Sequence, residues 1–529
     1  MGIPSYFSHI IRNYPNIIRT LSFFYRLPGF QFDELYMDCN SIIYDAVHTL
    51  EKDYSKLIDF EKSVIQLVIL KIEAYIKMIK PRDLVYIAFD GVAPFAKMEQ
   101  QRTRRYKAQF MTKIENNKNQ WNTSAITPGT QFMTKLCNAI NKHFIGSEKK
   151  YNIDRIITSC SDEPGEGEHK LFQYIRNTTK SRKIAVYGLD SDLIMLSIFH
   201  LKYCTDIFIF REAPEFLKSS IPVDVHSKDD EPHFLDIKHL ASCINAEMAC
   251  KYHEPDLRRT VDYVFMCFLL GNDFLPHFPA MNIRTHGITA LLDIYRKCIG
   301  SHSGRFFISN SNEIIWKHVK IFIYEVAKLE YRFLVNEYFV RDNFDKRTYP
   351  ETTNEEKQEV LKNAPIIYRA EEKYICPEEP YWENRYYKTL FHSSGDDVKN
   401  ICTNYLEGLE WVFTYYTNEC VDWKWKYNYH YPPLFADLVK YIPTDEHVFI
   451  EKKSKNPFSS NAQLSYVLPA TLHYLLPDKI NSVIKEKYTS SYPESYSFQW
   501  AFCRYLWEAH PILPDISIQQ LEYIDSIAV

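Results

Sequence analysis

Four short β-prone stretches, each closing at an acidic residue, place the strongest constraint on the fold of this chain. They read ELYMD, DLVYIAFD, RIITSCSD and KIAVYGLDSD, and the acids at their ends are Asp38, Asp90, Asp162, Asp190 and Asp192. Helix-length amphipathic stretches such as residues 61–79 separate them. This alternation predicts a parallel α/β sheet. In such sheets ligands bind beyond the carboxyl ends of the strands, so acids that are remote in sequence are expected at one edge.

Seven acidic residues are candidates for a metal site at that edge. They are Asp38, Asp90, Glu166, Glu168, Asp190, Asp192 and Asp273. Mg²⁺ prefers hard oxygen ligands, and two divalent ions about 4 Å apart can activate water and stabilise the leaving oxygen in phosphodiester hydrolysis. We therefore expect two magnesium ions, with manganese as the alternative. A single Asp after a strand often only caps the next helix, but the recurrence of the pattern favours a site.

The local sequence predicts how two pairs of these acids are presented. Asp190 and Asp192 are two residues apart, a spacing that places both on one face of an extended strand end. Glu166 and Glu168 lie in PGEGEHK, whose glycines allow a bent loop that enters a helix. So many carboxylates at one site repel one another, and a metal ion is the simplest compensation.

A basic helix is expected after the strand that leads to Asp90, in the stretch FDGVAPFAKMEQQRTRRYK. On a helix, four of its residues fall within an arc of about 100°, namely Lys97, Gln101, Arg104 and Arg105. Arg can bind phosphate oxygens in pairs, Lys adds a point charge and Gln a neutral donor. From the residues alone, this face is either a phosphate-binding surface or an ordinary solvated helix face.

Composition limits the classes of partner and compartment. With a net charge of −4, the whole chain is not a polycation, so a nucleic-acid partner would require a local basic site. Twelve cysteines without a Cys-x-x-Cys pair favour reduced thiols over a disulfide framework or a zinc site. The start, MGIPSYFS, fits neither a signal peptide nor a myristoylation signal, and no apolar run approaches the about 18 residues of a membrane span. We expect a soluble, intracellular protein with no membrane partner.

The chain is long enough for several domains. Its 529 residues, 46% of them hydrophobic, can bury a large core and fit roughly two to four domains. We expect an α/β domain over residues 1–300, a helical segment and charged connector over 301–380, a second, aromatic-rich region over 381–514, and a short tail over 515–529. The connector is predicted from RDNFDKRTYPETTNEEKQEV, which is charged and contains proline.

At this point the motifs are those of a known family. The first set of motifs lies within residues 1–279 and comprises MGIPSYF, YMDCNSIIY, FDGVAPFAKMEQQRTRRYK, ITPGTQFM, DEPGEGEHK, YGLDSDLIMLS and FMCFLLGNDFLPHFP. A second set follows after residue 380 and comprises ENRYYK, YLEGLEWVFTYY, WKWKYNYHYPP, QLSYVLP and WEAHPILP. With these stretches the chain resembles the XRN family of 5′→3′ exoribonucleases. The resemblance implies a PIN/FEN-like α/β nuclease core with a mainly parallel sheet, followed by a largely helical second conserved region. Because the chain ends soon after WEAHPILP, it resembles a compact member, for which a viral origin is one option.

The resemblance also implies a reaction and roles for individual residues. It implies a Mg²⁺-dependent nuclease whose metal site is the seven acids, and which degrades single-stranded RNA from a 5′-monophosphate end, releasing nucleoside 5′-monophosphates during RNA turnover. The face formed by Lys97, Gln101, Arg104 and Arg105 resembles the family's pocket for the 5′-phosphate. Trp425 corresponds to the family's stacking Trp, with Trp423 as the alternative, and Tyr44 stands where the family usually has a stacking His. We expect a cytoplasmic location, with the nucleus as the alternative.

Two other functions remain open on the sequence. A FEN-like structure-specific DNA nuclease would share the acidic core, although PGEGEHK and GNDFLPHFP favour the XRN family. A catalytically inactive RNA-binding scaffold is the non-enzymatic alternative, and the presence of all seven acids argues against it.

Overall fold

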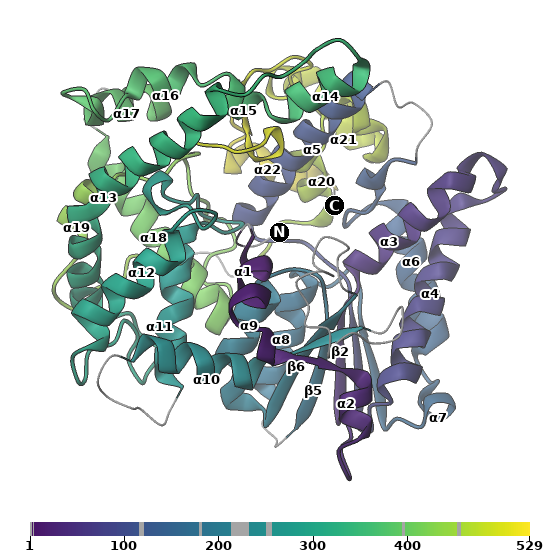
Figure 1. Cartoon of the computed structure of the whole chain (residues 1–529). Coiled ribbons are helices and arrows are strands. Elements are labelled where there is room, and N and C mark those ends of the chain that lie inside the picture. The colour runs from purple at the N-terminus through teal and green to yellow at the C-terminus, as the bar shows by residue number, and fades with distance from the viewer. Residues whose placement is uncertain are drawn as a thin grey trace.

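A seven-stranded sheet lies at the centre of the first half of the chain (Figure 1). The computed structural model describes residue 3 and residues 5–115, 121–178, 182–212, 232–249, 257–393, 397–451 and 456–528. The strands are β1 (Ile18–Thr20), β2 (Glu34–Asp38), β3 (Leu84–Ala88), β4 (Arg155–Ser159), β5 (Lys183–Tyr187), β6 (Asp206–Arg211) and β7 (His233–Asp236). Their order across the sheet is β1-β7-β6-β5-β2-β3-β4.

The five strands from β4 to β6 are all parallel, and β7 pairs antiparallel with β6 and β1. β2 is the middle one of the five parallel strands, with Asp38 opposite Ala88 of β3 and Met37 opposite Tyr187 of β5. The carboxyl ends of β2, β3 and β5 therefore meet at one edge. This confirms the predicted parallel α/β core and explains why acids that follow different strands converge.

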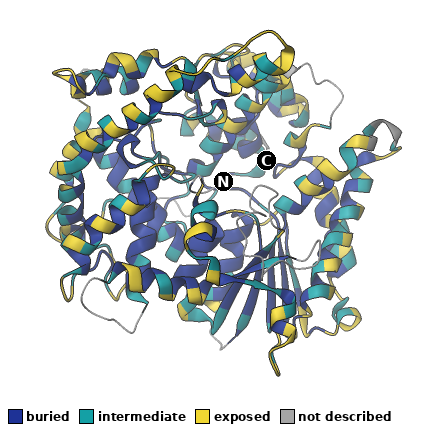
Figure 2. Cartoon of the chain, in the orientation of Figure 1, coloured by how far each residue is buried: buried dark blue, intermediate teal, exposed yellow. Residues whose placement is uncertain are grey.

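Alternate residues of each strand are buried on opposite faces of the sheet, as the period of two requires. Leu35 and Met37 share a core with α3 (Asn40–Leu50), α4 (Phe60–Ile79) and α6 (Gln131–Phe144). Tyr36 faces the other core, which includes α8 (Gly167–Asn177), α9 (Asp192–His200) and α10 (Ile237–Met248). Figure 2 shows the strands almost wholly buried between these two layers.

The second half of the chain is mainly helical and packs onto the α8–α9 side. Its principal helices are α11 (Arg258–Cys267), α12 (Gly287–Tyr295), α13 (Trp316–Asp345), α18 (Val398–Thr417) and α19 (Phe435–Tyr441). One hydrophobic core joins α8 and α9 to α11, α13 and α18. The same hydrophobic core contains residues from both sides of residue 300. The domain boundaries at residues 300 and 380 therefore stay predictions.

Shorter elements complete the chain. They are α1 (Tyr6–Asn13), α2 (Leu21–Tyr25), α7 (Glu148–Tyr151), α14 (Asn354–Lys362), α15 (Ala364–Ile367), α16 (Ala370–Ile375), α17 (Trp382–Phe391), α20 (Ser460–Val467), α21 (Asp478–Lys487), α22 (Ile518–Ala528), β8 (Phe498–Gln499) and β9 (His510–Pro511). Residues 515–529, predicted to be a tail, include α22, whose Leu521 and Ile524 are buried against α20 and α21. Among the described residues, no helix is both long and apolar enough to cross a membrane.

The long helix α5 (Phe95–Glu115) connects the sheet edge to the C-terminal helices. Basic residues outside the predicted functional face bind backbone carbonyls of the second half. Arg102 donates to the carbonyls of Ser491 (3.1 Å) and Pro514 (2.9 Å). Lys107 and Lys113 donate to carbonyls near the same end of the chain. Arg102, which is buried, and Lys107 therefore hold α5 in place, whereas Lys113 is exposed near the end of the helix.

The stability of the helical half should depend on one acidic residue, Glu372, because it belongs to a buried ion-pair network. Arg341, at the start of the stretch predicted to be an exposed connector, is buried, and its Nε lies 2.9 Å from Glu372 Oε2. Arg369 also binds Glu372, at 2.7 Å. Glu372→Ala leaves two buried guanidinium groups without this partner and should lower the free energy of unfolding by about 3–5 kcal/mol. Urea unfolding measures the loss, and the exposed Glu378→Ala is the control; a loss equal in both variants would contradict it.

Candidate active site

A cavity of about 420 Å³ lies at the carboxyl edge of β2, β3 and β5. Six of the seven predicted acids line it, namely Asp38, Asp90, Glu166, Glu168, Asp190 and Asp273. Asp38 is the last residue of β2, Asp90 follows β3, and Asp190 follows β5. Glu166 is the residue before α8, and Glu168 lies in its first turn, as the loop-to-helix interpretation of PGEGEHK predicts.

The predicted presentation of Asp190 and Asp192 on one strand face is wrong. β5 ends at Tyr187, so Asp190 lies in a loop and Asp192 is the first residue of α9. Asp190 is exposed and lines the cavity, whereas Asp192 is buried and does not. The negative charge of Asp192 nevertheless raises the pKa of Glu168, after burial the largest contribution. Asp192 therefore interacts electrostatically with the acids that line the cavity, although it does not line the cavity itself.

The backbone at the start of α8 approaches the carboxylates of Asp38 and Asp90 closely, and hydrogen bonds orient Asp90. Asn40 Nδ2 donates to Asp90 Oδ2, and Asp90 N donates back to Asn40 Oδ1 at 3.1 Å. Gly167 N donates to Asp90 Oδ1 at 2.7 Å. A Cβ on Gly167 would lie 2.6 Å from Asp38 Oδ1, which is too close for a real contact. Only glycine therefore lets the start of α8 approach both carboxylates.

The acidic group carries more negative charge than its surroundings neutralise. Burial raises the pKa of Asp38 well above its usual range, and the charges of Asp90 and Asp190 raise it further. Lys97 Nζ forms ion pairs with Glu166 and, at 2.8 Å, with Asp273. Burial alone would raise the pKa of Asp273, but this ammonium group contributes to holding it below its usual range.

The donor set fits a divalent cation that prefers oxygen ligands. Asp38 Oδ1 and Glu168 Oε2 are buried atoms with no hydrogen-bond partner among the residues that the structure describes. Such atoms are costly unless a ligand satisfies them. All the acidic side chains offer hard carboxylate oxygens, the ligands that Mg²⁺ and Mn²⁺ favour. Orphaned oxygens and mutual repulsion are both relieved by the same ion.

The predicted basic face of α5 lines this same cavity. Lys97, Gln101, Arg104 and Arg105 all contribute to its wall. Arg104 is exposed, while Arg105 is buried and donates to Thr127 Oγ1. The wall of the cavity therefore includes both the acids and these basic and amide side chains.

Some residues that sequence reasoning did not find line the cavity or support its wall. Gln463 Nε2 donates to Gln101 Oε1 at 3.0 Å. The oxygen end of the Gln101 amide is therefore held by α20. From α3, Tyr44 lines the cavity as predicted for its position, together with Asn40 and His48. Tyr44 and His48 are one helical turn apart, a spacing that could have indicated a shared face. Gln463 comes from α20, and no local signal points to it.

Trp425 does not lie at the acidic cavity, contrary to the prediction of a stacking surface there. Its side chain is only 9% exposed and stacks on Trp411, with ring centroids 5.2 Å apart and planes inclined by 23°. Its Nε1 donates to Glu407 at 3.3 Å. Trp423, the alternative, lines a different cavity beside His169 and Tyr415. The Trp411 ring therefore covers one face of the Trp425 indole.

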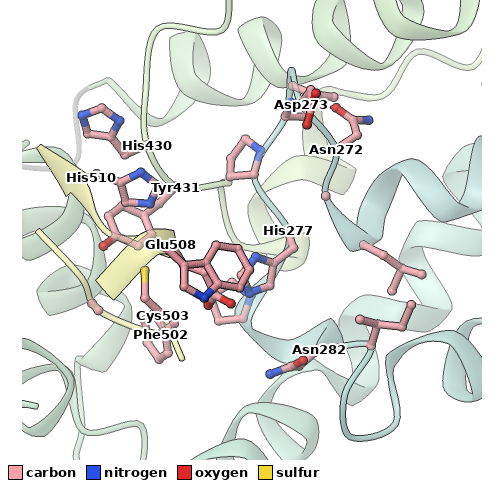
Figure 3. Close-up of a pocket in the computed structure, with 18 of the residues that line it drawn as sticks. Asn272, Asp273, His277, Asn282, His430, Tyr431, Phe502, Cys503, Glu508 and His510 are labelled. Carbon is pink, nitrogen blue, oxygen red and sulfur yellow. Dashed lines mark hydrogen bonds between the residues drawn. The ribbon is translucent and has the colours of Figure 1, made fainter. Parts of the chain in front are cut away.

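A second cavity of about 210 Å³ shares Asp273 with the acidic one. Figure 3 shows Asp273 and Asn272 at one end and His430, His510 and Tyr431 at the other. Burial lowers the pKa of His277, His430 and His510, which keeps these side chains neutral. Its lining acids are Asp273 and Glu508. The grouped carboxylates therefore single out the first cavity as the candidate metal centre.

Without divalent ions, the folded protein should lose stability as the pH rises from acid to neutral. Burial, with the charges of Asp273 and Asp190, raises the pKa of Asp192 to about 7, while an unfolded Asp titrates near about 3.9. The folded state binds this proton more tightly, so its contribution to stability is fully present below the unfolded pKa. It is lost as the pH rises through about 7.

Thermal unfolding in chelator at a series of pH values measures this loss. Asp192→Asn removes the titrating group and should flatten the profile between these limits. A wild-type stability that increases with pH over the same window would contradict the assignment.

Comparison with known families accounts for nearly the whole chain. The family described as XRN 5′-3′ exonuclease N-terminus matches residues 1–213, and the Xrn1 helical domain matches residues 254–379 and 372–524. A 5′-3′ exoribonuclease 2 homolog of Drosophila melanogaster is 26% identical over 89% of this chain and 64% of its own length. The 5′-3′ exoribonucleases 1 of Schizosaccharomyces pombe and Saccharomyces cerevisiae are 27% and 26% identical over 89% of this chain, and 44% and 39% of their own lengths.

The chain thus spans less than two thirds of the length of these three relatives. The two family matches, however, cover strands β1–β6 with the acidic edge and the helical half that packs on the sheet. The chain therefore belongs to the family of XRN 5′-3′ exonucleases.

Proposed function

We propose that this chain is a metal-dependent 5′→3′ exoribonuclease. Its substrate is single-stranded RNA with a 5′-monophosphate, and its products are nucleoside 5′-monophosphates. The observation that carries the proposal is that one cavity holds both the carboxylate group and the basic face of α5. The three relatives, all named 5′-3′ exoribonucleases, support the same reaction class.

The carboxylates would hold two Mg²⁺ or Mn²⁺ ions, which when bound activate water and stabilise charge on the leaving oxygen. Asn40 and the backbone of Gly167 keep the Asp90 carboxylate turned towards the cavity. Lys97 offsets the charge of Glu166 and Asp273 and favours the ionised carboxylates, the form that binds metal ions.

The basic face would bind the 5′-phosphate at a set distance from the acids. Arg104 and Arg105 supply charged donors to phosphate oxygens, and the Gln101 amide, oriented by Gln463, supplies a neutral donor. Because α5 is anchored at its other faces by carbonyls of the second half, this distance is fixed. A fixed distance would release one nucleotide per cycle.

A time course on one RNA with four different 5′ ends tests the proposal. In Mg²⁺, the monophosphate RNA should be degraded from its 5′ end to mononucleotides much faster than the hydroxyl, triphosphate and capped RNAs. Chelator should stop the reaction. A flapped DNA substrate is included because a FEN-like nuclease would prefer it. Equal cleavage of hydroxyl and monophosphate RNA would contradict the phosphate pocket, and persistence of every RNA would favour an inactive RNA-binding scaffold.

A further inference from the structure

Two cysteines and an acid that are distant in sequence meet beside β4. Cys137 lies on α6, Cys160 directly follows β4, and Asp162 comes two residues later. Their two sulfur atoms and a carboxylate oxygen all lie within 4.8 Å of one another. In the part of the chain that the structure describes, no other three His, Cys, Asp or Glu side chains meet this criterion. The acids of the candidate active site are a separate group.

The surroundings hold both sulfur atoms in place and leave one side open. Ser161 N donates to Cys137 Sγ at 3.4 Å, and Ser161 Oγ lies 3.3 Å from the same sulfur. Cys160 Sγ donates to Asn141 Oδ1 at 3.6 Å. Both cysteines are buried, whereas Asp162 is exposed. The donors aimed at Cys137 favour its thiolate, the form that binds metals. Cys160 instead donates to an acceptor and gives up its proton when the ion binds. The exposed carboxylate of Asp162 provides a route of entry.

The two cysteines and Asp162 adjoin the loop that carries Glu166 of the candidate active site. Lys170 Nζ donates to the carbonyl of Cys160 at 2.7 Å and to that of Phe89 at 2.9 Å. Phe89 precedes Asp90, and the loop from Cys160 leads to Glu166. A ligand shared by Cys137 and Cys160 would therefore fasten α6 to the segment that positions Glu166.

We propose that Cys137, Cys160 and Asp162 bind a Zn²⁺ ion, with water as the fourth ligand. Thiolates select Zn²⁺ over Mg²⁺, and Zn²⁺ accepts carboxylate oxygen in the same tetrahedral shell. With Zn–S bonds of about 2.3 Å, tetrahedral ligand atoms lie roughly 3–4 Å apart, so small side-chain rotations complete the site. Binding displaces the remaining thiol protons into solvent. The site is independent of the proposed nuclease reaction.

Zinc titration of the full chain tests the site. Protein stripped with chelator and returned to excess Mg²⁺, which fills the oxygen sites, should bind one Zn²⁺. Cd²⁺ in its place should give the charge-transfer absorbance of metal–thiolate bonds. Cys160→Ser should weaken Zn²⁺ binding more than about 100-fold, beyond the range for loss of an outer-shell partner. Asp162→Asn should weaken it less, and Cys243→Ser, which changes a cysteine on α10, should leave it unchanged.

Other results would overturn the proposal. Zinc binding that survives Cys160→Ser but is lost in Asp38→Asn would place the ion in the acidic cavity. Purified protein that is lighter by two hydrogens, with a Cys137–Cys160 disulfide and no zinc uptake after reduction, would also exclude the site. If Cys160→Ser does not fold, alkylation of the wild-type protein decides: zinc must protect Cys137 and Cys160 but not Cys243, and equal labelling with and without zinc refutes it.

Discussion

Asp38→Asn should reduce hydrolysis of 5′-monophosphate RNA by about a thousandfold or more, while making the metal-free protein more stable to heat. Asp38 is the last residue of β2, and its buried Oδ1 has no hydrogen-bond partner in the described part of the chain. Loss of an anionic ligand removes several kcal/mol of transition-state stabilisation, and each 1.4 kcal/mol is about tenfold in rate. Removing one of several repelling buried carboxylates should meanwhile raise Tm in chelator. Single-turnover kinetics and thermal unfolding measure the two effects.

The opposite signs of these effects separate a functional role from a structural one. Asp293→Asn, which changes an exposed acid on α12, is the matched control and should alter neither rate nor Tm. Addition of Mg²⁺ should raise the Tm of the wild-type protein more than that of Asp38→Asn. A variant that loses activity together with stability in chelator would identify Asp38 as a structural residue and not a metal ligand.

The acidic edge could be predicted because it depends on local patterns and on one topological rule. The apolar runs that end near Asp38 and Asp90 became β2 and β3, and the helix expected over residues 61–79 is α4. Parallel pairing then brings the ends of remote strands together whatever the rest of the fold. The periodicity of α5 likewise identified Lys97, Gln101, Arg104 and Arg105 as one face, and all four line the cavity.

Predictions that required a boundary or a long-range contact were less successful. The prediction for Asp190 and Asp192 assumed that the strand extends through both residues. In the structure β5 ends at Tyr187 and α9 begins at Asp192. A tryptophan in an aromatic-rich stretch has the same composition whether it binds a base or packs in a core, and Trp425 packs on Trp411. The ion pairs of Lys97 with the carboxylates join segments about 70 or more residues apart, which helix periodicity cannot indicate.

The same limit applies to cysteines. Spacing rules detect metal sites whose ligands lie on one short hairpin or loop. Cys137 and Cys160 come from a helix and from the end of a neighbouring strand, so their approach depends on how α6 packs against the sheet. The absence of Cys-x-x-Cys therefore excludes only the local class of site, and the fold is needed to find the other.

Arg104→Ala should reduce kcat/KM for 5′-monophosphate RNA by about ten- to a hundredfold and leave the slow cleavage of 5′-hydroxyl RNA unchanged. Hydrogen bonds to charged groups contribute about 1.5–3 kcal/mol, which sets this range. Arg104 is the exposed member of the basic face, so its removal opens no cavity in the core. Competition between the two RNAs in one reaction measures the ratio directly.

The control lies on the same helix. Lys113→Ala removes an equal charge from α5, but Lys113 donates to the carbonyl of Glu494 and does not line the cavity. It should therefore change neither rate. If both variants slowed both RNAs equally, the effect would be general electrostatic attraction of RNA, which depends on charge and salt but not on the 5′ end. Only a change in the ratio, confined to Arg104→Ala, assigns the basic face of α5 to the terminal phosphate.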